Sequence, residues 1–231
     1  MKTIGMIGGM SWESSLLYYR LINQGVNQRL GGLHSAKIIM SSIDFAPLEA
    51  LQHSGDWQAA AEILIDSAQQ VEAAGADIFL IATNTMHQVA DTVTAAVDIP
   101  LLHIADATAA ALSSDGITRI GLLGTAFTME LDFYRDRIQQ YGIEVVVPEL
   151  HDRQMVHDII YQELCRGCVD DDSRDVYLAI IERMRAQQID AVILGCTEIG
   201  MLLQPRHTDM KLYDSTALHA ARAVELALLQ D

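Results

Sequence analysis

Short apolar runs alternate with longer amphipathic stretches along most of the 231-residue chain. The short runs have strand length and are rich in Ile, Leu and Val, whereas the longer stretches repeat their apolar residues at helical spacing. This alternation is typical of an α/β protein with parallel sheets. The expected strands are residues 3–7, 37–41, 78–82, 101–104, 119–123, 144–147, 191–194 and 211–213.

Amphipathic helices are expected between these strands. The clearest examples are residues 57–74, 154–165 and 175–187. A last helix is expected over residues 215–230, because Ser215 is a suitable N-cap for the apolar pattern that follows it.

Two pairs of segments show that the pattern repeats within the chain. Residues 4–20 resemble residues 120–135 with one residue of slippage, and residues 77–86 align with residues 190–199 without a gap. The two pairs come in the same order and at nearly the same spacing. A repeat of this length predicts two similar lobes.

The repeat also sets the expected domain boundaries. The first lobe should comprise residues 1–114, completed by residues 210–231, and the second lobe should comprise residues 115–209. Thr83 and Cys196 then occupy equivalent positions, each just beyond the carboxyl end of a strand, where open parallel sheets place their ligands. If the lobes face each other, these two side chains also face each other.

Thr83 and Cys196 suggest proton transfer at an acidic carbon. A thiol between a strand end and a helix start lies near unpaired N–H groups and a helix dipole, which should lower its pKa and make it a usable base. Inversion of a carbon centre needs one group to remove a proton from one face and another to deliver a proton to the opposite face. The alternative reading of Cys196 is a small, inert buried residue.

Four motifs in order resemble those of the aspartate/glutamate racemase family of amino-acid racemases. They are Gly8-Gly-Met-Ser11, Thr83-Asn-Thr-x-His87, Gly195-Cys-Thr-Glu198 and Asp214-Ser-Thr-Ala-Leu-His219. The resemblance implies two pseudo-symmetric flavodoxin-like lobes with the active site between them, a homodimer, and an isomerase that uses neither pyridoxal phosphate (PLP) nor another cofactor.

Family members usually carry a cysteine in both central motifs, whereas this chain has Thr83 at the first. It therefore resembles the Thr/Cys branch, which is specific for L-aspartate and L-glutamate. An unassisted Thr hydroxyl is too weak an acid to rest as an alkoxide. We therefore expect Cys196 to remove the α-proton of the L-enantiomer and Thr83, or a water that it holds, to reprotonate the other face. The D-enantiomer should then be a poor substrate.

The remaining site residues are expected around these two. Backbone N–H groups of the first motif and of the loops after the two strands could bind a substrate carboxylate and the developing negative charge. The substrate-binding set is Met10, Gln52, Asn84, Thr85 and Thr197, with Gln52 carried over from the family. The supporting set is Gly8, Gly9, Ser11, Glu198, His87 and His219. The glycines could instead serve a tight turn, and His219 could be a core residue.

Charge and cysteine content narrow the possible partners. The formal net charge of −16 repels polyanions, so nucleic acid and anionic membrane surfaces are poor candidates. Three cysteines in an ordinary composition favour reduced thiols over a disulfide framework. No signal-like or membrane-spanning run is evident in the sequence, so we expect a cytoplasmic protein that acts on a small amino acid.

Other motifs are weaker. Gly5-x-x-Gly8-Gly9 lacks the dinucleotide-binding spacing, although Asp44 could serve as a ribose partner, so NAD(P) stays a minor possibility. Cys165 and Cys168 form one C-x-x-C that His151 and His157 could complete as a zinc site, but its place at a helix end favours a structural role, and no metal is expected. Two functions remain open besides racemisation: an arylmalonate-type decarboxylase that uses one cysteine, and a catalytically inactive amino-acid-binding homologue.

Overall fold

The computed structural model describes residues 1–229, which divide into two compact units. Unit 1 contains Met1–Ile104 and the segment from His219 onward, and unit 2 contains Ala105–Leu218. Each unit holds a four-stranded sheet in which every strand pairing is parallel. The strands are β1 (Ile4–Gly8), β2 (Ile38–Ser42), β3 (Ile78–Ile81), β4 (Leu101–Leu102), β5 (Arg119–Gly124), β6 (Glu144–Val146), β7 (Ala191–Gly195) and β8 (Lys211–Asp214).

Helices connect successive strands, as parallel pairing requires. The α-helices are α1 (Trp12–Leu30), α2 (Phe45–Ser54), α3 (Trp57–Ala73), α4 (Ala90–Thr94), α5 (Ile104–Ser114), α6 (Ala126–Glu130), α7 (Asp132–Gln139), α8 (Leu150–Gln162), α9 (Asp171–Arg185), α10 (Ile199–Leu202) and α11 (Ser215–Leu228). Three short 3-10 helices are η1 (Thr85–Val89), η2 (Leu164–Arg166) and η3 (Pro205–His207). Residue 230, the expected end of the last helix, lies outside the described residues.

The two sheets share one strand order, which confirms the α/β class and agrees with the repeat in the sequence. The first sheet runs β2-β1-β3-β4 and the second runs β6-β5-β7-β8. The eight expected strands are all present, with bounds that differ from the predicted ones by at most two residues. β1 corresponds to β5 and β3 to β7. The segments that follow β3 and β7 are therefore topologically equivalent.

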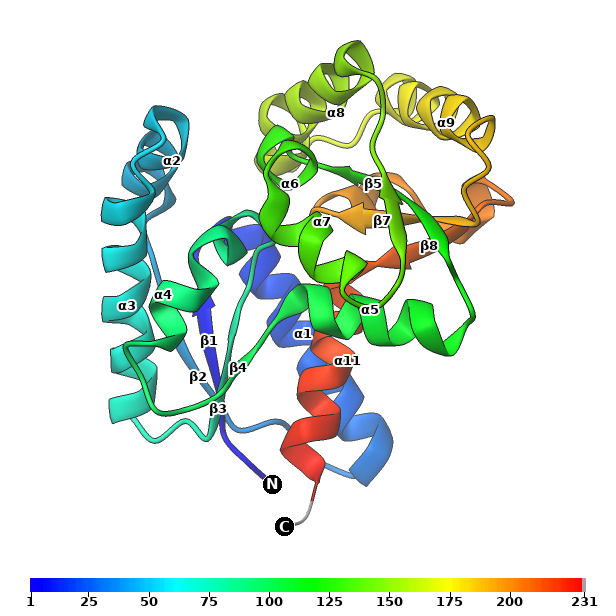
Figure 1. Cartoon of the computed structure of the whole chain (residues 1–231). Coiled ribbons are helices and arrows are strands. Elements are labelled where there is room, and N and C mark those ends of the chain that lie inside the picture. The colour runs from blue at the N-terminus through cyan, green and yellow to red at the C-terminus, as the bar shows by residue number, and fades with distance from the viewer. Residues whose placement is uncertain (230–231) are drawn as a thin grey trace. The chain divides into compact units, whose positions relative to one another are not determined.

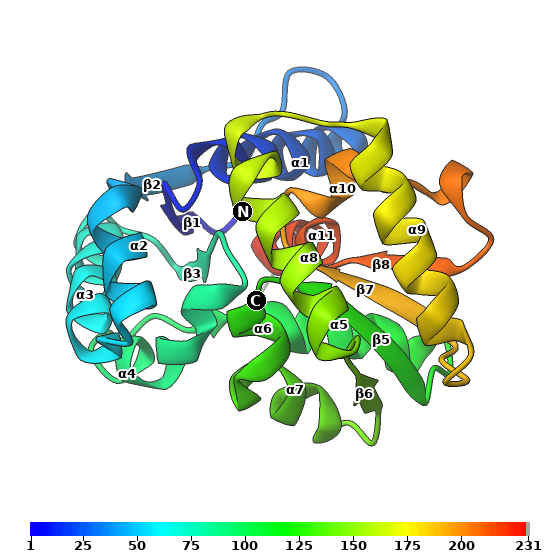
Figure 2. The same ribbon diagram turned by 90° about the horizontal axis from the view of Figure 1, so that it is seen from above.

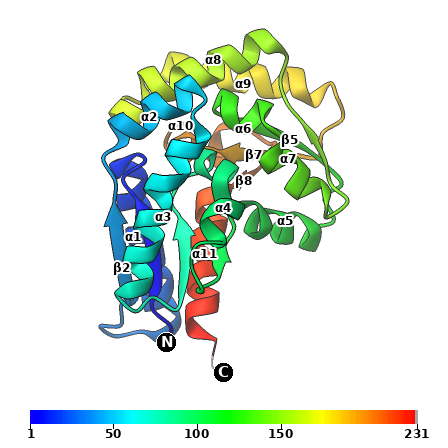
Figure 3. The same cartoon turned by 60° about the vertical axis from the view of Figure 1, so that its left-hand side comes forward.

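Unit 1 buries both faces of its sheet (Figures 1 and 3). On one face, Ile7, Phe79 and Ile81 pack in a core with apolar residues of α2, α3 and η1. On the other face, Ile4 and Leu80 belong to a core formed with α1 and α11. Successive strand residues point to opposite faces, so burial on both sides explains why these strands read as continuous apolar runs.

Unit 2 pairs its helices through side-chain contacts. Arg183 of α9 makes two hydrogen bonds to the Asp152 carboxylate of α8, at 2.7 and 2.8 Å, so the two helices lie side by side (Figure 2). Arg137 of α7 makes an equivalent fork to Asp106 of α5, also at 2.7 and 2.8 Å. Paired N–H donors match carboxylate geometry and fix the orientation of each helix pair.

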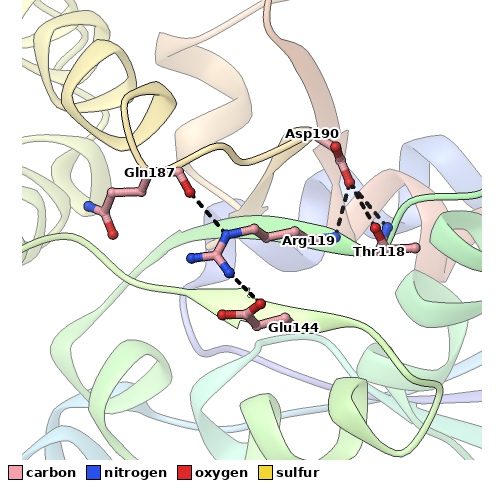
Figure 4. Close-up of polar contacts among 5 residues, drawn as sticks. All are labelled: Thr118, Arg119, Glu144, Gln187 and Asp190. Atoms are coloured by element: carbon pink, nitrogen blue, oxygen red, sulfur yellow. Dashed lines mark hydrogen bonds and ion pairs between the residues drawn. The ribbon is translucent and has the colours of Figure 1, made fainter.

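An aspartate before the third strand fixes the amino-terminal edge of each sheet. In unit 1 the Asp77 carboxylate accepts a hydrogen bond from the Thr3 amide at 2.5 Å. In unit 2 the Asp190 carboxylate accepts from the amides of Thr118 and Arg119, at 3.2 and 3.0 Å (Figure 4). Asp77 and Asp190 begin the two segments that align in the sequence, so the repeat preserves this contact as well as the strand pattern.

The expected domain boundaries need correction at two places. We expected residues 210–231 to complete the first lobe, but β8 pairs with β7 in the second sheet, Ile193 opposite Tyr213. We also expected the first lobe to extend to residue 114, but residues 105–114 belong to unit 2, where Asp106 of α5 bonds to Arg137 of α7. The reason is common to both: the partner of a strand or helix depends on long-range contacts, which local periodicity does not encode. In the described part of residues 210–231, α11 supplies the residues that pack in the core of unit 1.

None of the helices among residues 1–229 is both long and apolar enough to cross a membrane.

A substitution at Gly9 tests the backbone conformation that the first motif requires. Gly9 has φ of +92°, and an added Cβ would lie 2.1 Å from the Ile43 carbonyl oxygen. Gly9→Ala should therefore lower the free energy of unfolding by at least about 2 kcal/mol, measured by urea denaturation. Gly55→Ala is the control, because Gly55 has φ of +74° with no atom near the added Cβ. It should cost only about 1 kcal/mol for the left-handed backbone. Equal costs would contradict the steric argument.

Candidate active site

In unit 1 the ends of β1 and β3 bring two motifs together. The strands are adjacent, with Ile7 opposite Ile81. The Ser14 hydroxyl, in the first turn of α1, donates to the Ala82 carbonyl at 2.7 Å, which ties the Gly8–Ser11 segment to the loop containing Thr83. Ser11 caps α1 by accepting from the Ser14 amide at 3.2 Å. The predicted first motif and the predicted Thr83 loop therefore form one cluster.

One predicted donor in this cluster is already engaged. The Gly9 amide donates to the Ser15 hydroxyl at 2.7 Å, so we correct the expectation that this N–H group is available to a substrate carboxylate. Ser15 lies in the first turn of α1, which starts immediately after the Gly8–Ser11 segment, and its hydroxyl thus reaches the Gly9 amide. Gly9 serves the turn itself, as its positive φ shows. Met10 beside it is buried.

The Thr83 loop combines a partly exposed hydroxyl residue with buried neighbours. Thr83 is half-buried, whereas Asn84 and Thr85 are buried at the start of η1. Gln52, from α2, is also buried and donates from Nε2 to the sulfur of Met86 at 3.0 Å. The structure therefore places Gln52 against Met86 of η1, just after Thr83, and its contact with a substrate stays a prediction.

His87 links the Thr83 loop to the segment after β4 through its two ring nitrogens. Its Nδ1 donates to the Thr83 carbonyl at 2.8 Å, and its Nε2 accepts from the Ile104 amide at 3.2 Å. Burial, followed by the neighbouring His103 and His219, lowers the pKa of His87 well below its ordinary value. His87 is therefore a neutral, buried residue and not a surface group.

His219 is a core histidine with both ring nitrogens bonded. Its Nδ1 accepts from the Tyr18 hydroxyl at 2.8 Å, and its Nε2 donates to the Leu102 carbonyl at 2.9 Å. Its ring centroid lies 5.9 Å from that of His87. Sequence reasoning did not single out Tyr18 or His103, because neither belongs to a motif.

In unit 2 the loop after β7 gathers a thiol, a hydroxyl and a carboxylate. Cys196 donates from Sγ to Oε2 of Glu198 at 2.9 Å, and the Thr197 hydroxyl donates to the same oxygen. The three residues are buried, and Cys196 is 9% exposed. Glu198 is thus the acceptor that organises the predicted Gly-Cys-Thr-Glu motif.

The electrostatics of Cys196 differ from the sequence expectation. Its pKa is raised well above the ordinary value, chiefly by burial and next by the negative charge of Glu198. The expected lowering by a helix dipole is wrong, because α10 has only four residues and a carboxylate lies next to the sulfur. The resting form is the thiol. Its conjugate thiolate, once formed, would be a correspondingly strong base.

Cys165 joins the same cluster. The Glu198 charge and a hydrogen bond to Glu198 raise the pKa of Cys165, after the larger effect of burial. In the sequence, Cys165 and Cys168 form a pair at a helix end, and nothing in the local spacing points to Glu198. Among the described residues, no group of three or more His, Cys, Asp or Glu side chains is placed to hold a metal ion.

Comparison with known proteins identifies relatives over most of the chain. Residues 7–223 match the family model for Asp/Glu/hydantoin racemases. A crystal structure from Yersinia pestis, of a protein proposed to be an Asp/Glu racemase, is 51% identical, covers 99% of this chain and 100% of its own, and superposes with a TM-score of 0.93. An aspartate racemase homologue from Pyrococcus horikoshii OT3 is 34% identical, with coverage of 98% and 99% and a TM-score of 0.85.

A more distant relative is the broad-specificity amino-acid racemase RacX of Bacillus subtilis strain 168. It is 24% identical over 165 residues, which are 71% of each chain. The family match spans all four motifs found in the sequence, from the first turn after β1 to His219 in α11. The chain belongs to the Asp/Glu/hydantoin racemase family.

Proposed function

We propose that this protein racemises aspartate, glutamate or a related polar amino acid, with a preference for the L-enantiomer. One observation carries the proposal: Cys196 and Thr83 follow corresponding strands of two sheets with the same order, yet they differ in acidity. A pair of unlike proton-transfer groups at equivalent positions suits a racemase that runs faster from one enantiomer. The equilibrium mixture must still be racemic, so the preference lies in the rates.

Cys196 is the proposed base for the L-enantiomer. Because its pKa is raised, the thiol must first pass its proton to water, and the resulting thiolate is basic enough to remove the weakly acidic α-proton. The Cα–H bond breaks, the proton passes to sulfur, and the electron pair is delocalised onto the substrate carboxylate. Glu198 holds the thiol in place through the 2.9 Å contact and sets its acidity.

Thr83 acts on the other face of the α-carbon. Its hydroxyl, or a water that it holds, donates a proton to the carbanion and gives the D-enantiomer. The oxygen regains a proton from solvent and Cys196 releases the abstracted proton to solvent, which closes the cycle. The hydroxyl is a poor base for the reverse step, which explains the expected weak use of D-substrates. All steps are proton transfers between protein, water and substrate, so the proposed reaction requires no PLP or other cofactor.

Substrate contacts are proposed for Met10, Gln52, Asn84, Thr85 and Thr197. All five are neutral and four have polar side chains that could bind the carboxylates of an acidic amino acid by hydrogen bonds, and such a set also allows other polar substrates. The relatives support an amino-acid substrate without fixing which one, since one is named for aspartate and another for broad specificity. The charge of −16 disfavours nucleic acid and anionic membranes as partners, and the three free cysteines favour the reducing cytoplasm.

Substitutions of the two proton-transfer residues test the reaction. Cys196→Ser should reduce racemisation of L-aspartate or L-glutamate by at least about a thousandfold, because a serine hydroxyl is a far weaker acid and its alkoxide is not available. Thr83→Cys should raise the rate from the D-enantiomer by about tenfold or more, because it supplies a second thiol. Both are measured by circular dichroism of the amino acid or by chiral chromatography.

Three outcomes would contradict the proposal. Release of carbon dioxide from aryl-substituted malonates by the wild type, with no racemisation of any amino acid, would identify a decarboxylase. Binding of amino acids with no exchange of the α-proton for deuterium would identify an inactive binding protein. Equal deuterium exchange from both enantiomers would refute the assignment of Cys196 as the single strong base.

The charge of Glu198 gives a test by pH. The negative carboxylate raises the pKa of Cys196, and the thiolate is the active form, so kcat/KM for the L-enantiomer should rise with pH. Glu198→Gln removes the charge and keeps the size. The pH at which kcat/KM rises should therefore fall by about one unit or more. Glu149→Gln, at an exposed position, is the control and should leave that pH unchanged. A rise at higher pH in Glu198→Gln would contradict this role.

We further propose that the protein forms a homodimer through α1. Trp12, Leu16 and Tyr19 recur at spacings of four and three residues and are 65%, 58% and 52% exposed, which makes an apolar stripe on one helix face. Leu16→Glu should shift the protein from dimer to monomer in sedimentation velocity at micromolar concentration. Leu33→Glu, which adds the same charge at a fully exposed apolar position outside the stripe, should leave the dimer intact. A wild-type monomer would refute the proposal.

A further inference from the structure

The carbonyl of Thr83 accepts a hydrogen bond from a side chain, at a point beyond the last backbone pair between β3 and β4. β4 has only two residues, and its pairing with β3 ends at Leu80 opposite Leu102. Thr83 lies three residues beyond that pair. A backbone segment past the end of a ladder has lost its regular hydrogen-bond partners, so its position depends on whatever else bonds to it.

His87 supplies that bond. The imidazole spans from the Thr83 carbonyl, 2.8 Å from Nδ1, to the Ile104 amide, 3.2 Å from Nε2. A carbonyl can only accept and an amide can only donate, so the proton resides on Nδ1 and the ring is neutral. The ring therefore bridges Thr83, three residues beyond Leu80 of β3, to Ile104, two residues beyond Leu102 of β4.

His219 fixes the other side of this bridge. Its Nε2 donates to the Leu102 carbonyl at 2.9 Å, while its Nδ1 accepts from the Tyr18 hydroxyl at 2.8 Å. Leu102 and Ile104 are two residues apart, so His219 and His87 bind the same short segment. Tyr18 comes from α1 and His219 from α11, and both side chains are fully buried. The end of β4 is thus anchored to two helices before His87 uses it as a support.

We propose that His87 is a positioning residue for Thr83, and that His219 and Tyr18 hold the β4 end on which His87 depends. This inference rests on the proposed function, in which Thr83 serves reprotonation and Cys196 serves abstraction. A displacement of the Thr83 loop should therefore slow one half of the reaction selectively. A network that only stabilised the core would affect both halves alike.

Two isosteric variants separate the two bonds of His87. An asparagine side-chain nitrogen reaches as far as Nδ1, so His87→Asn can keep the bond to the Thr83 carbonyl and lose the bond to Ile104. A glutamine side-chain oxygen reaches as far as Nε2, so His87→Gln can keep the bond to the Ile104 amide and lose the bond to Thr83. His53→Gln, on the exposed side of α2, is the control for adding glutamine.

The two halves of the reaction are separated by the choice of substrate. Racemisation of the L-amino acid requires abstraction and reprotonation. Elimination from its β-chloro analogue requires abstraction alone: the Cys196 thiolate takes the α-proton, the electron pair forms a Cα–Cβ double bond, and chloride leaves. The resulting enamine is hydrolysed by water to the keto acid and ammonia, which can be assayed directly.

His87→Gln should lower racemisation by about tenfold or more while chloride elimination from the L-analogue stays within about twofold of the wild type. His87→Asn should lose several-fold less racemisation than His87→Gln, and His53→Gln should match the wild type. Equal loss of racemisation and elimination in His87→Gln, or equal racemisation in the two His87 variants, would overturn the positioning role.

Tyr18→Phe keeps the test decisive if the His87 variants do not fold. It removes one hydroxyl from the network and leaves the ring, so it should lower racemisation by a smaller factor and again spare elimination. Unchanged racemisation in Tyr18→Phe would overturn the proposed part of Tyr18 and His219. A wild type that neither racemises nor eliminates would instead refute the proposed function, which distinguishes the two failures.

Discussion

Parallel pairing of the first and third strands in each sheet is the constraint on which the rest of the molecule depends. β1 pairs with β3, and β5 pairs with β7, in both cases as the central strands of the sheet. Central parallel strands must bury both faces, which requires helices on each side and a helical crossover between strands. That architecture leaves the carboxyl ends of the strands as the place where irregular segments can carry polar side chains. Thr83 and Cys196 lie in those segments.

The two segments solve different electrostatic problems. After β7, a thiol and a hydroxyl both donate to Glu198, so a buried carboxylate receives the hydrogen bonds that burial demands. The same carboxylate opposes ionisation of the thiol. After β3 there is no comparable charge in the described contacts of Thr83, and a neutral imidazole holds the backbone. In the loop after β7 the main effect is on the acidity of Cys196, and in the loop after β3 it is on the position of Thr83.

The helices and strands next to these two loops are short. η1 and α10 are short, and β4 contributes only two residues to its sheet. Side-chain bonds replace the missing backbone ladder: Ser14 to the Ala82 carbonyl, His219 to the Leu102 carbonyl and His87 to the Thr83 carbonyl. The first two bonds are buried and the third is part-buried, where an unsatisfied carbonyl would be costly. This explains why hydroxyl and imidazole residues occur in segments that are otherwise apolar.

The sequence by itself determined the α/β class, the eight strands, the repeat and the correspondence of Thr83 with Cys196, because these follow from local periodicity and spacing. Its motifs also identified the family, which the comparisons confirm. Only the tertiary structure decided that β8 completes the second sheet, that the Gly9 amide is occupied, and that Cys165 shares Glu198 with Cys196. It also reversed the expected direction of the Cys196 pKa. These features depend on burial and on partners far away in sequence, and a residue's own neighbours along the chain carry no record of either.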